Sequence, residues 1–275
     1  SLAIGGNHFI HAIRRNVDLN VILFNNEIYG LTKGQYSPTS KLGKITKTSP
    51  YGTVEKPFTP GELVIGAKGT FFARSIDAEV NLTKECLVEA AKHQGMSVTE
   101  CLQNCVIFND KTHAAFAADK ATRAEHTITV RHGQKMTFGA NNEKGLVFEN
   151  MKLKVVTIGE DGYTLDQVLT HDAHEKDTTL HTMLAAMKYP DYPVALGVIR
   201  CVEDDTVYDQ AVERQVEEVV LGFPKNMDGS ESLRAPLYRQ FAALLEEALG
   251  KPPVLWDERR TTIDAHQILF NSGKN

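Results

Sequence analysis

Short apolar runs recur along most of the chain. Val21–Phe24 is a continuous apolar run that stops at Asn25-Asn26, and further runs lie at Thr70–Ile76, Lys152–Gly159 and Tyr192–Arg200. Runs of this length are typical of strands, and a run without polar alternation predicts burial on both faces, as in a parallel sheet. We therefore expect Val21–Phe24 to be a strand buried on both faces.

Segments with helical spacing separate these runs. Leu82–His93 places Leu87, Ala90 and Ala91 on one face, and other helices are expected at His8–Arg15, from Pro60-Gly61-Glu62 onward, and at Thr179–Lys188. The alternation of strands and helices predicts an α/β fold with a doubly wound, mostly parallel sheet. Gly5-Gly6-Asn7, ahead of the first helix, is expected to be a loop whose amides could approach an anion, although a tight turn explains it equally well.

Two stretches carry no clear periodicity. Residues 36–61 contain Pro38, Pro50, Pro57 and Pro60, and so long a loop is usually functional or disordered. Residues 109–150 hold His113, His126 and His132 without metal-ligand spacing, and short strands are expected at Thr127–Arg131 and Thr137–Phe138. The polar cluster His171-Asp172-Ala173-His174-Glu175 has no regular helical face, so we interpret it as a loop before a helix.

Composition narrows the function classes only slightly. The 275 residues carry a formal net charge of -5, which offers no general electrostatic attraction to nucleic acid or to an anionic membrane. No run approaches the roughly 18 apolar residues of a membrane-spanning helix, and the N-terminus lacks a signal pattern, so a cytoplasmic location is expected. Four cysteines do not make a disulfide framework in a chain of this length.

The Asn pair after the first apolar run is the strongest candidate site. Ligands of open α/β sheets lie beyond the carboxyl ends of the strands, and neutral amide oxygens suit a hard cation such as Mg²⁺. An ordinary turn remains the alternative, because Asn tolerates left-handed backbone geometry.

The segment Asn25-Asn26-Glu27-Ile28-Tyr29-Gly30-Leu31-Thr32-Lys33-Gly34-Gln35, with Ile4-Gly5-Gly6-Asn7-His8 upstream, resembles a known motif. It is similar to the thiamine-diphosphate motif of 2-oxoacid:ferredoxin oxidoreductase β subunits, most of all their 2-oxoglutarate branch. The resemblance runs from Ser1 to about Glu217 and implies a sheet of thiamine-diphosphate-binding type. The family's motif opens with Gly-Asp-Gly-Asp, whose first Asp binds the metal, and Ser1 is expected to follow directly after that tetrapeptide.

The resemblance also implies roles for particular residues. Gly6, Asn7 and His8 would contact the diphosphate, while the Asn26 side chain and the Ile28 carbonyl would bind Mg²⁺. Lys33 is our candidate for pairing with the distal carboxylate of a dicarboxylic 2-oxoacid, and a solvated loop lysine is the alternative. The loop at residues 36–61 would face the partner subunit.

Cys101 and Cys105 form a C-x₃-C pair, which alone supports neither zinc nor an iron–sulfur cluster, so two buried cysteines are the simplest interpretation. By resemblance, however, Cys105 precedes Phe108-Asn109 at the place of the fourth ligand of a [4Fe-4S] cluster. The other three ligands of the family lie in an N-terminal portion that this chain lacks. Cys101 would be an extra, non-ligating thiol.

From about Glu218 the resemblance changes. Val219-Val220-Leu221-Gly222-Phe223-Pro224-Lys225-Asn226-Met227-Asp228-Gly229-Ser230 and Val254-Leu255-Trp256-Asp257-Glu258-Arg259-Arg260-Thr261-Thr262 are similar to two signatures of Holliday-junction-resolvase-like nucleases, also described as pre-16S ribosomal RNA processing nucleases, of RNase H fold. The pattern of this tail predicts two βα units: strand 218–223, helix 232–249, strand 253–257 and helix 262–270. Phe241, Leu244, Leu245 and Ala248 give the first helix an apolar stripe.

Asp257 and Glu258 end the second strand of the tail, where carboxylates can bind a divalent metal for phosphodiester hydrolysis. By resemblance, Glu258 would be one of three acidic metal ligands. The other two acidic positions of the family are missing, so we favour a pair of βα units without nuclease activity.

Two domains are thus expected, an oxidoreductase β-subunit domain at 1–217 and a partial nuclease segment at 218–275. The first implies oxidative decarboxylation of a 2-oxoacid, 2-oxoglutarate above others, to an acyl-CoA. Its implied partners are an α subunit, ferredoxin, the 2-oxoacid and coenzyme A, and its implied cofactors are thiamine diphosphate, Mg²⁺ and a [4Fe-4S] cluster. Nucleic acid is a partner only under the nuclease alternative, and no membrane is expected. Joining of two fragments without either activity is the third hypothesis, and the isolated chain should not turn over.

Overall fold

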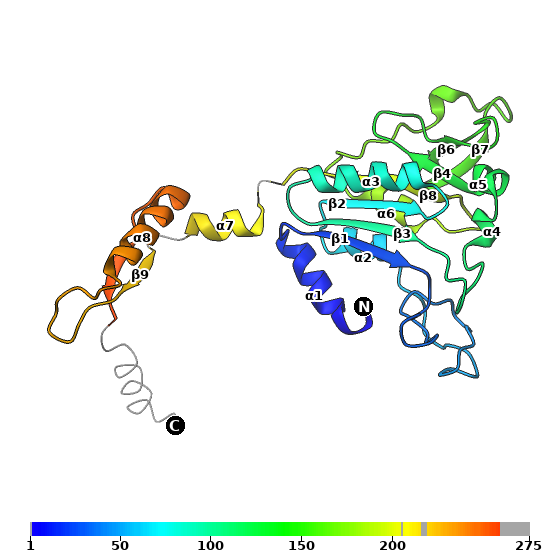
Figure 1. The fold of residues 1–275 in the computed structure, drawn as a ribbon. Helices are drawn as coiled ribbons and strands as arrows, with labels where there is room; N and C mark the ends of the chain where they lie inside the picture. Colours follow the sequence, from blue (N-terminus) through cyan, green and yellow to red (C-terminus); the bar gives the residue numbers. More distant parts are fainter. Residues whose placement is uncertain (1, 205, 216–218, 259–275) are drawn as a thin grey trace. The chain divides into compact units, whose positions relative to one another are not determined.

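Five apolar segments meet in one sheet whose order is β1 (Asn20–Asn25), β3 (Ser97–Leu102), β2 (Phe71–Ile76), β8 (Val194–Cys201) and β4 (Thr127–Val130) (Figure 1). The structure is a computed structural model that describes residues 2–204, 206–215 and 219–258. β1, β3 and β2 run parallel, β8 is antiparallel to β2, and β4 is parallel to β8. The sheet is therefore mixed and mostly parallel, and the predicted α/β class is confirmed.

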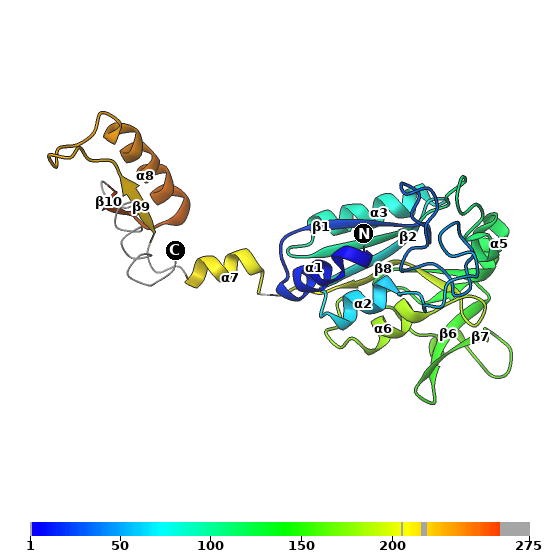
Figure 2. The same ribbon diagram turned by 90° about the horizontal axis from the view of Figure 1, so that it is seen from below.

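Helices cover both faces of this sheet (Figures 1 and 2). α3 (Val80–Lys92) packs on one face, where Leu82, Cys86 and Ala90 join the buried side chains of β2. α1 (Leu2–Arg15), α2 (Pro60–Gly66) and α6 (Thr179–Ala186) contribute to the core on the other face. On α3 the inward prediction holds for Ala90 but is wrong for Ala91, which is exposed because it lies one position past the buried stripe.

The prediction that Val21–Phe24 is buried on both faces is wrong. β1 pairs only with β3 and is an edge strand of the described sheet. Its side chains alternate, so Val21 packs against the core that includes α1, whereas Ile22 and Phe24 remain 48% and 61% exposed. An apolar run predicts a strand, but neighbouring elements decide how many of its faces are covered.

The loop predicted at Gly5-Gly6-Asn7 is also corrected. These residues lie inside α1, which extends from Leu2 to Arg15. Glycine costs a helix about 1 kcal/mol relative to alanine. The apolar face of α1, with Phe9, Ala12 and Ile13 against the core, offers packing that can offset this cost.

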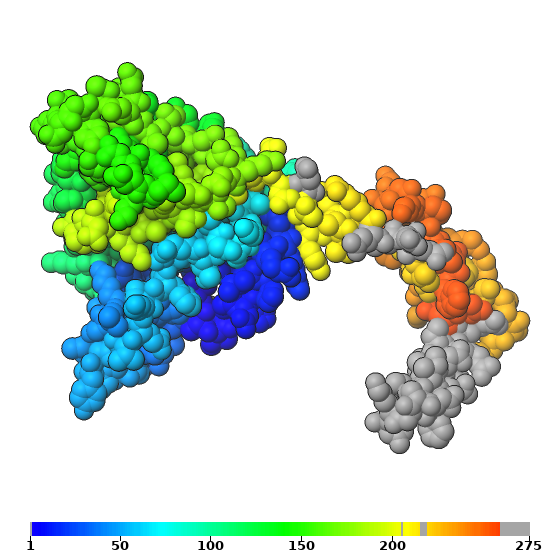
Figure 3. Space-filling model, turned by 180° about the vertical axis from the view of Figure 1, so that it is seen from behind, coloured from blue at the N-terminus to red at the C-terminus, as the bar shows by residue number. Residues whose placement is uncertain are grey.

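A three-stranded antiparallel sheet, β5 (Thr137–Phe138), β6 (Lys144–Glu149) and β7 (Lys152–Thr157), extends the core through Met136, Leu146 and Leu153. The strands β3 and β6 were not predicted. The short helices α4 (Ala114–Ala117), α5 (Lys120–His126) and η1 (Leu165–Gln167) complete this part of the chain. Helix and strand are absent from residues 26–59, so the predicted long loop is confirmed, and Figure 3 shows it as a light-blue lobe.

The chain divides into two compact units, Ser1–Gln210 and Ala211–Asn275. The second contains β9 (Val220–Phe223), α8 (Ala235–Leu249) and β10 (Val254–Asp257), preceded by α7 (Tyr208–Gln215) at the boundary. β9 and β10 are parallel, as predicted for a βα repeat. The stripe on α8 is less buried than expected, since Phe241 and Leu244 are exposed. The predicted helix at 262–270, Glu217 and Glu218 lie outside the described residues.

No helix in the described ranges is both long and apolar enough to cross a membrane.

Candidate functional site

The candidate site is the turn that follows β1. Asn25 is the last residue of the strand, and Glu27 adopts a left-handed backbone conformation with φ +53°. The Asn26 Oδ1 atom accepts a hydrogen bond from the Ile28 backbone N–H at 3.3 Å, which closes the turn over two residues. Ile28 itself is buried and anchors the turn in the protein.

Residues distant in sequence hold the turn from one side. The Asn109 side-chain amide donates to the Asn26 carbonyl at 2.9 Å, and the Thr112 hydroxyl donates to a Glu27 carboxylate oxygen at 3.0 Å. The Ser40 hydroxyl donates to the Glu27 carbonyl at 2.5 Å. His113 is buried, and its Nε2 atom lies 3.0 Å from the Asn25 carbonyl, which has only acceptor character, so Nε2 carries the proton.

The two atoms implied as metal ligands fit that chemistry. Within the described part of the chain, the Ile28 carbonyl receives no hydrogen bond, and Asn26 Oδ1 receives only the one from Ile28. A carbonyl oxygen has two lone pairs, so the Ile28 oxygen retains both and Asn26 Oδ1 retains one. Neutral amide and main-chain oxygens suit Mg²⁺, which also keeps water and phosphate ligands. Both oxygens are therefore open to a divalent cation, and a diphosphate and water would supply its other ligands.

The implied diphosphate contacts lie on α1. Gly6, Asn7 and His8 are in its second turn, and a Cβ at Gly6 would meet no atom within 4 Å. Figure 1 shows α1 running back along β1, so that its first turns lie toward the end of the sheet where Asn26 follows β1. Among the described residues, no hydrogen bond joins these three residues to the turn. The open space at Gly6 suits the close approach of a ligand.

Lys33 lies in the next turn, which the Gly34 N–H closes by donating to the Tyr29 carbonyl at 3.0 Å. Lys33 is exposed, has φ +65°, and forms no side-chain hydrogen bond or ion pair within the described residues. Gly34 has φ +94°, and a Cβ there would approach the Phe108 ring to 3.0 Å. A glycine is therefore required beside Lys33, and the lysine is presented to solvent.

Cys105 is close to this motif. A Cβ at Gly30 would lie 3.9 Å from the Cys105 sulfur, and the thiol is partly exposed. Cys101, by contrast, is buried in β3, where burial raises the pKa of its thiol. Groups of three or more His, Cys, Asp or Glu side chains able to hold a metal are absent among the described residues. Cys105 can thus supply one cluster ligand, and the described residues alone do not fit a complete cluster.

A buried ion pair lies beneath the turn. Arg74 Nε on β2 donates to Glu100 Oε2 on β3 at 2.7 Å, and both side chains are almost fully buried. The Asn25 amide donates to the other Glu100 oxygen at 2.7 Å. These residues line a cavity of about 220 Å³ together with Lys41, His113 and the end of α6. Asn25 and Glu27 of the turn also line this cavity, so the cavity lies directly beside the turn.

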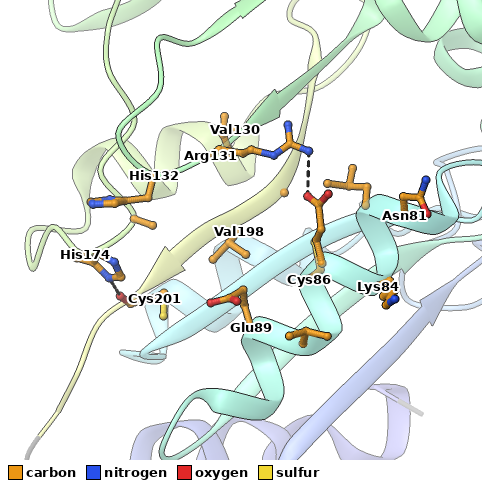
Figure 4. A pocket seen from close by; sticks show the side chains of 15 residues that line it. Asn81, Lys84, Cys86, Glu89, Val130, Arg131, His132, His174, Val198 and Cys201 are labelled. Atoms are coloured by element: carbon orange, nitrogen blue, oxygen red, sulfur yellow. Dashed lines mark hydrogen bonds and ion pairs between the residues drawn. The ribbon is translucent and has the colours of Figure 1, made fainter.

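A second cavity, of about 670 Å³, lies between α3 and the strands β4 and β8 (Figure 4). Arg131 at the end of β4 pairs with Glu85 across it at 2.9 Å. Burial raises the pKa of Cys86, on the α3 wall, to about 12. β4 runs antiparallel to β1. Arg131, which follows β4, therefore lies at the opposite end of the strands from Asn26, which follows β1. This cavity is therefore separate from the predicted site.

The acidic pair of the tail lies at the end of β10. Asp257 pairs with Lys225 at 3.9 Å, and Glu258 Oε2 lies within 2.5 Å of the position that a Cβ on Gly222 would take. The structure brings these carboxylates to a strand end, as predicted. It does not bring a third acidic side chain to them within the described residues.

Several residues around the turn were missed in the sequence. Arg74 and Glu100 each interrupt a segment that becomes a fully buried strand, and a charge in such a segment is a usable signal because buried charges are normally paired. Thr39, Ser40 and His113 carried no comparable signal. Their roles depend on loop positions that only the folded chain defines.

Comparisons with known proteins confirm both resemblances. Residues 1–101 match the family model described as thiamine pyrophosphate enzyme, C-terminal TPP binding domain, and residues 202–275 match the Holliday junction resolvase model. The chain is 40% identical over 234 residues to the 2-oxoglutarate oxidoreductase subunit KorB of Mycobacterium tuberculosis, covering 85% of this chain and 61% of that protein. It is 47% identical over 105 residues to the 2-oxoglutarate synthase subunit KorB of Archaeoglobus fulgidus, covering 38% of this chain and 39% of that protein.

A solved structure has the same fold. The 2-oxoglutarate:ferredoxin oxidoreductase from Magnetococcus marinus, solved with 2-oxoglutarate, coenzyme A and succinyl-CoA bound, superposes with a TM-score of 0.55 at 21% identity. The match covers 96% of this chain and 63% of that chain. The chain therefore spans a little over three fifths of the length of the Mycobacterium tuberculosis subunit and of the solved Magnetococcus marinus chain, and the likeness to the solved structure shows the α/β fold.

Proposed function

We propose that residues 1–217 form the cofactor-binding part of the β subunit of a 2-oxoacid:ferredoxin oxidoreductase that acts on 2-oxoglutarate. The observation that carries the proposal is the turn after β1, whose Asn26 Oδ1 and Ile28 carbonyl are ready to accept a cation. The match of residues 1–101 to the TPP-binding domain and the similarity to KorB proteins support it. When bound, thiamine diphosphate supplies an electron sink for decarboxylation of the 2-oxoacid.

The residues of this chain bind and orient in this proposal. Asn26 and Ile28 hold Mg²⁺, and Gly6, Asn7 and His8 receive the diphosphate. Hydrogen bonds from Ser40 and Asn109 fix the turn before any ligand arrives, so little ordering is required when the cation binds.

Lys33 is proposed to recognise the substrate. Its ammonium group is exposed in a turn that directly follows the proposed cation site. A point positive charge there would attract the distal carboxylate of 2-oxoglutarate, which pyruvate lacks. Lys33 thus provides the proposed selection between 2-oxoacids.

The long loop is proposed to dock the α subunit. Leu31, Tyr51 and Val54 are more than nine-tenths exposed. Large apolar side chains that are exposed in one loop usually mark an interaction surface. Cys105 is proposed as one ligand of a [4Fe-4S] cluster. The cluster would pass electrons to ferredoxin, and coenzyme A would accept the acyl group. The remaining cluster ligands must come from outside the described residues.

Calorimetry of the full chain with thiamine diphosphate and Mg²⁺ tests the cation site. Asn26→Ala is expected to weaken Mg²⁺-dependent cofactor binding at least tenfold, because one of two protein oxygens is removed. Asn81→Ala, an exposed position on α3, is the matched control and is expected to bind as the wild type does. Equal affinity of the Asn26→Ala and wild-type chains would refute the assignment of Asn26.

The reaction itself is tested in the complex with the α subunit. Viologen reduction should require both 2-oxoglutarate and coenzyme A, and it should be lost with Asn26→Ala. Reduction that depends on neither compound would refute the substrate assignment while leaving the cofactor site untouched.

For residues 218–275 we propose a segment similar to part of a resolvase-type nuclease, with no role in the oxidoreductase chemistry. The pairing of Asp257 with Lys225 supports this proposal, because that carboxylate already has a cationic partner. Divalent-metal-dependent cleavage of nucleic acid by the chain would overturn it.

A further inference from the structure

Both carboxylate oxygens of the ion pair beneath the turn accept hydrogen bonds from protein groups. Glu100 accepts from Arg74 Nε with one oxygen and from the Asn25 amide with the other, both at 2.7 Å. A second guanidinium nitrogen of Arg74 donates to the Ala185 carbonyl at 3.1 Å on α6. The three side chains come from the adjacent strands β1, β3 and β2 and lie on one face of the sheet.

Glu100 determines which way the Asn25 amide faces. An ionised carboxylate only accepts hydrogen bonds, so the NH₂ end of the amide must point toward Glu100. The oxygen end, Oδ1, must then point toward the turn. There it accepts from the Thr39 hydroxyl at 2.8 Å and from the Glu27 N–H at 3.3 Å.

Arg74 and Glu100 hold the NH₂ end of the Asn25 amide together. Arg74 pairs with one Glu100 oxygen, which leaves the other oxygen fixed as the acceptor of the Asn25 amide. Without that acceptor, the NH₂ group of Asn25 would have no partner there and the amide could turn over. The Glu27 N–H, at the residue with φ +53°, would then lose its acceptor and the turn would loosen.

We propose that Arg74 and Glu100 are positioning residues, which act through the Asn25 amide to hold the turn that presents Asn26 Oδ1 and the Ile28 carbonyl to a divalent cation. They touch neither the cation nor the substrate. This inference rests on the proposed cofactor site and names the device that pre-organises it. Burial of an ion pair contributes little net stability by itself, and fixing one arrangement of neighbouring polar groups is a function that such pairs can serve.

The other role open to Arg74 is that of a substrate receptor, because it lines the 220 Å³ cavity. Its Nε and one Nη atom already donate to Glu100 and Ala185. A substrate carboxylate at the same guanidinium would place a second negative charge beside Glu100, inside the protein, against one positive charge. The geometry therefore favours positioning over substrate binding.

Amide hydrogen exchange of the cofactor-free chain is the first test. Glu100→Gln, nearly the same size, is expected to speed exchange at Glu27 and Ile28 at least tenfold, because the carboxylate no longer orients Asn25. Glu85→Gln, which breaks an exposed ion pair on α3, is the matched control and should leave these two amides unchanged. Unchanged protection in Glu100→Gln overturns the proposal, and this readout needs no cofactor binding.

Calorimetry with thiamine diphosphate and Mg²⁺ is the second test. Glu100→Gln should weaken binding about tenfold, the scale of one hydrogen bond to a charged group. Adding Glu100→Gln to Asn25→Ala should cause no further loss, since both changes act through one amide. Additive losses would overturn the proposal.

Two further outcomes separate the possible failures. A raised KM for 2-oxoglutarate with unchanged cofactor affinity in Arg74→Met would make Arg74 a substrate receptor and overturn positioning. If Glu100→Gln fails to fold, Thr39→Val tests the same amide from the other side, and unchanged protection at Glu27 overturns the proposal. A wild-type chain that binds no cofactor would refute the proposed function, while the exchange experiment still decides the role of Glu100.

Discussion

Acidification below pH 6.5 is expected to destabilise the first unit through His171. This side chain is fully buried in the loop before α6. Its Nε2 atom lies 2.9 Å from the Val198 carbonyl on β8 and must carry the proton, whereas its Nδ1 atom is buried without a hydrogen-bond partner. Protonation would place a second N–H, and a charge, where no acceptor is available.

The magnitude follows from the pKa of His171. Burial lowers this pKa from 6.5 to about 4, partly opposed by the bond to Val198, with smaller contributions from His181, His132 and Asp172. Above pH 6.5 both folded and unfolded states hold a neutral ring. Between pH 6.5 and about 4 only the unfolded state binds the proton, so stability falls with decreasing pH. The full difference corresponds to about 3 kcal/mol of unfolding free energy.

Denaturant unfolding from pH 7.5 to 4 would measure this loss. The only tryptophan of the chain, Trp256, lies in the second unit, so circular dichroism and the imidazole NMR signal of His171 are the appropriate observables. His171→Phe should start less stable and lose about 3 kcal/mol less over the same pH range. His11→Gln, at an exposed position, should follow the wild type.

Two results would contradict this reasoning. One is an identical pH dependence of stability in His171→Phe and in the wild type. The other is a His171 imidazole that titrates near pH 6.5 in the folded chain, which would show that the site admits water or a counter-charge.

Three further outcomes are expected. Lys33→Ala should raise the KM of the complex for 2-oxoglutarate at least tenfold and leave pyruvate kinetics unchanged; equal effects on both substrates in steady-state assays would contradict a role in selection. Gly34→Ala should destabilise the chain by about 1–3 kcal/mol in thermal unfolding, because its φ of +94° strains any residue with a Cβ; an unchanged Tm would contradict this. Asp257→Asn should leave viologen reduction unchanged, and a loss of more than twofold would connect the tail to the reaction.

The strand-helix alternation was predictable because it depends on local periodicity. The runs at Val21–Phe24 and Thr70–Ile76 form strands, and Leu82–His93 lies largely within a helix. β3 was missed because Ser97–Leu102 contains Thr99 and Glu100, and such a polar segment does not predict a buried strand. Every one of its residues is nevertheless buried. Polar residues can occupy a central strand when neighbouring strands supply partners, which the sequence does not show.

The degree of burial was less predictable than the elements themselves. Gly5 and Gly6 suggested a loop, but helix α1 continues through them because packing of its apolar face outweighs a local preference. Ile22 and Phe24 suggested a two-sided strand, but β1 has only one described neighbour in the sheet. Both errors arise because propensity and hydrophobicity describe a segment, whereas burial depends on what lies against it.

In the candidate site, too, the local features were predictable and the features that depend on distant residues were not. Asn26 and Ile28 are two residues apart, and their hydrogen bond belongs to a local turn that the motif could indicate. The features that make this turn rigid come from Glu100 and Asn109, more than 70 positions away in sequence. A short motif therefore identifies the atoms that meet the ligand but not the groups that orient them. A charged residue within a buried strand, as at Glu100, is the one local sign of such a distant role, because its burial requires partners that must lie elsewhere in the chain.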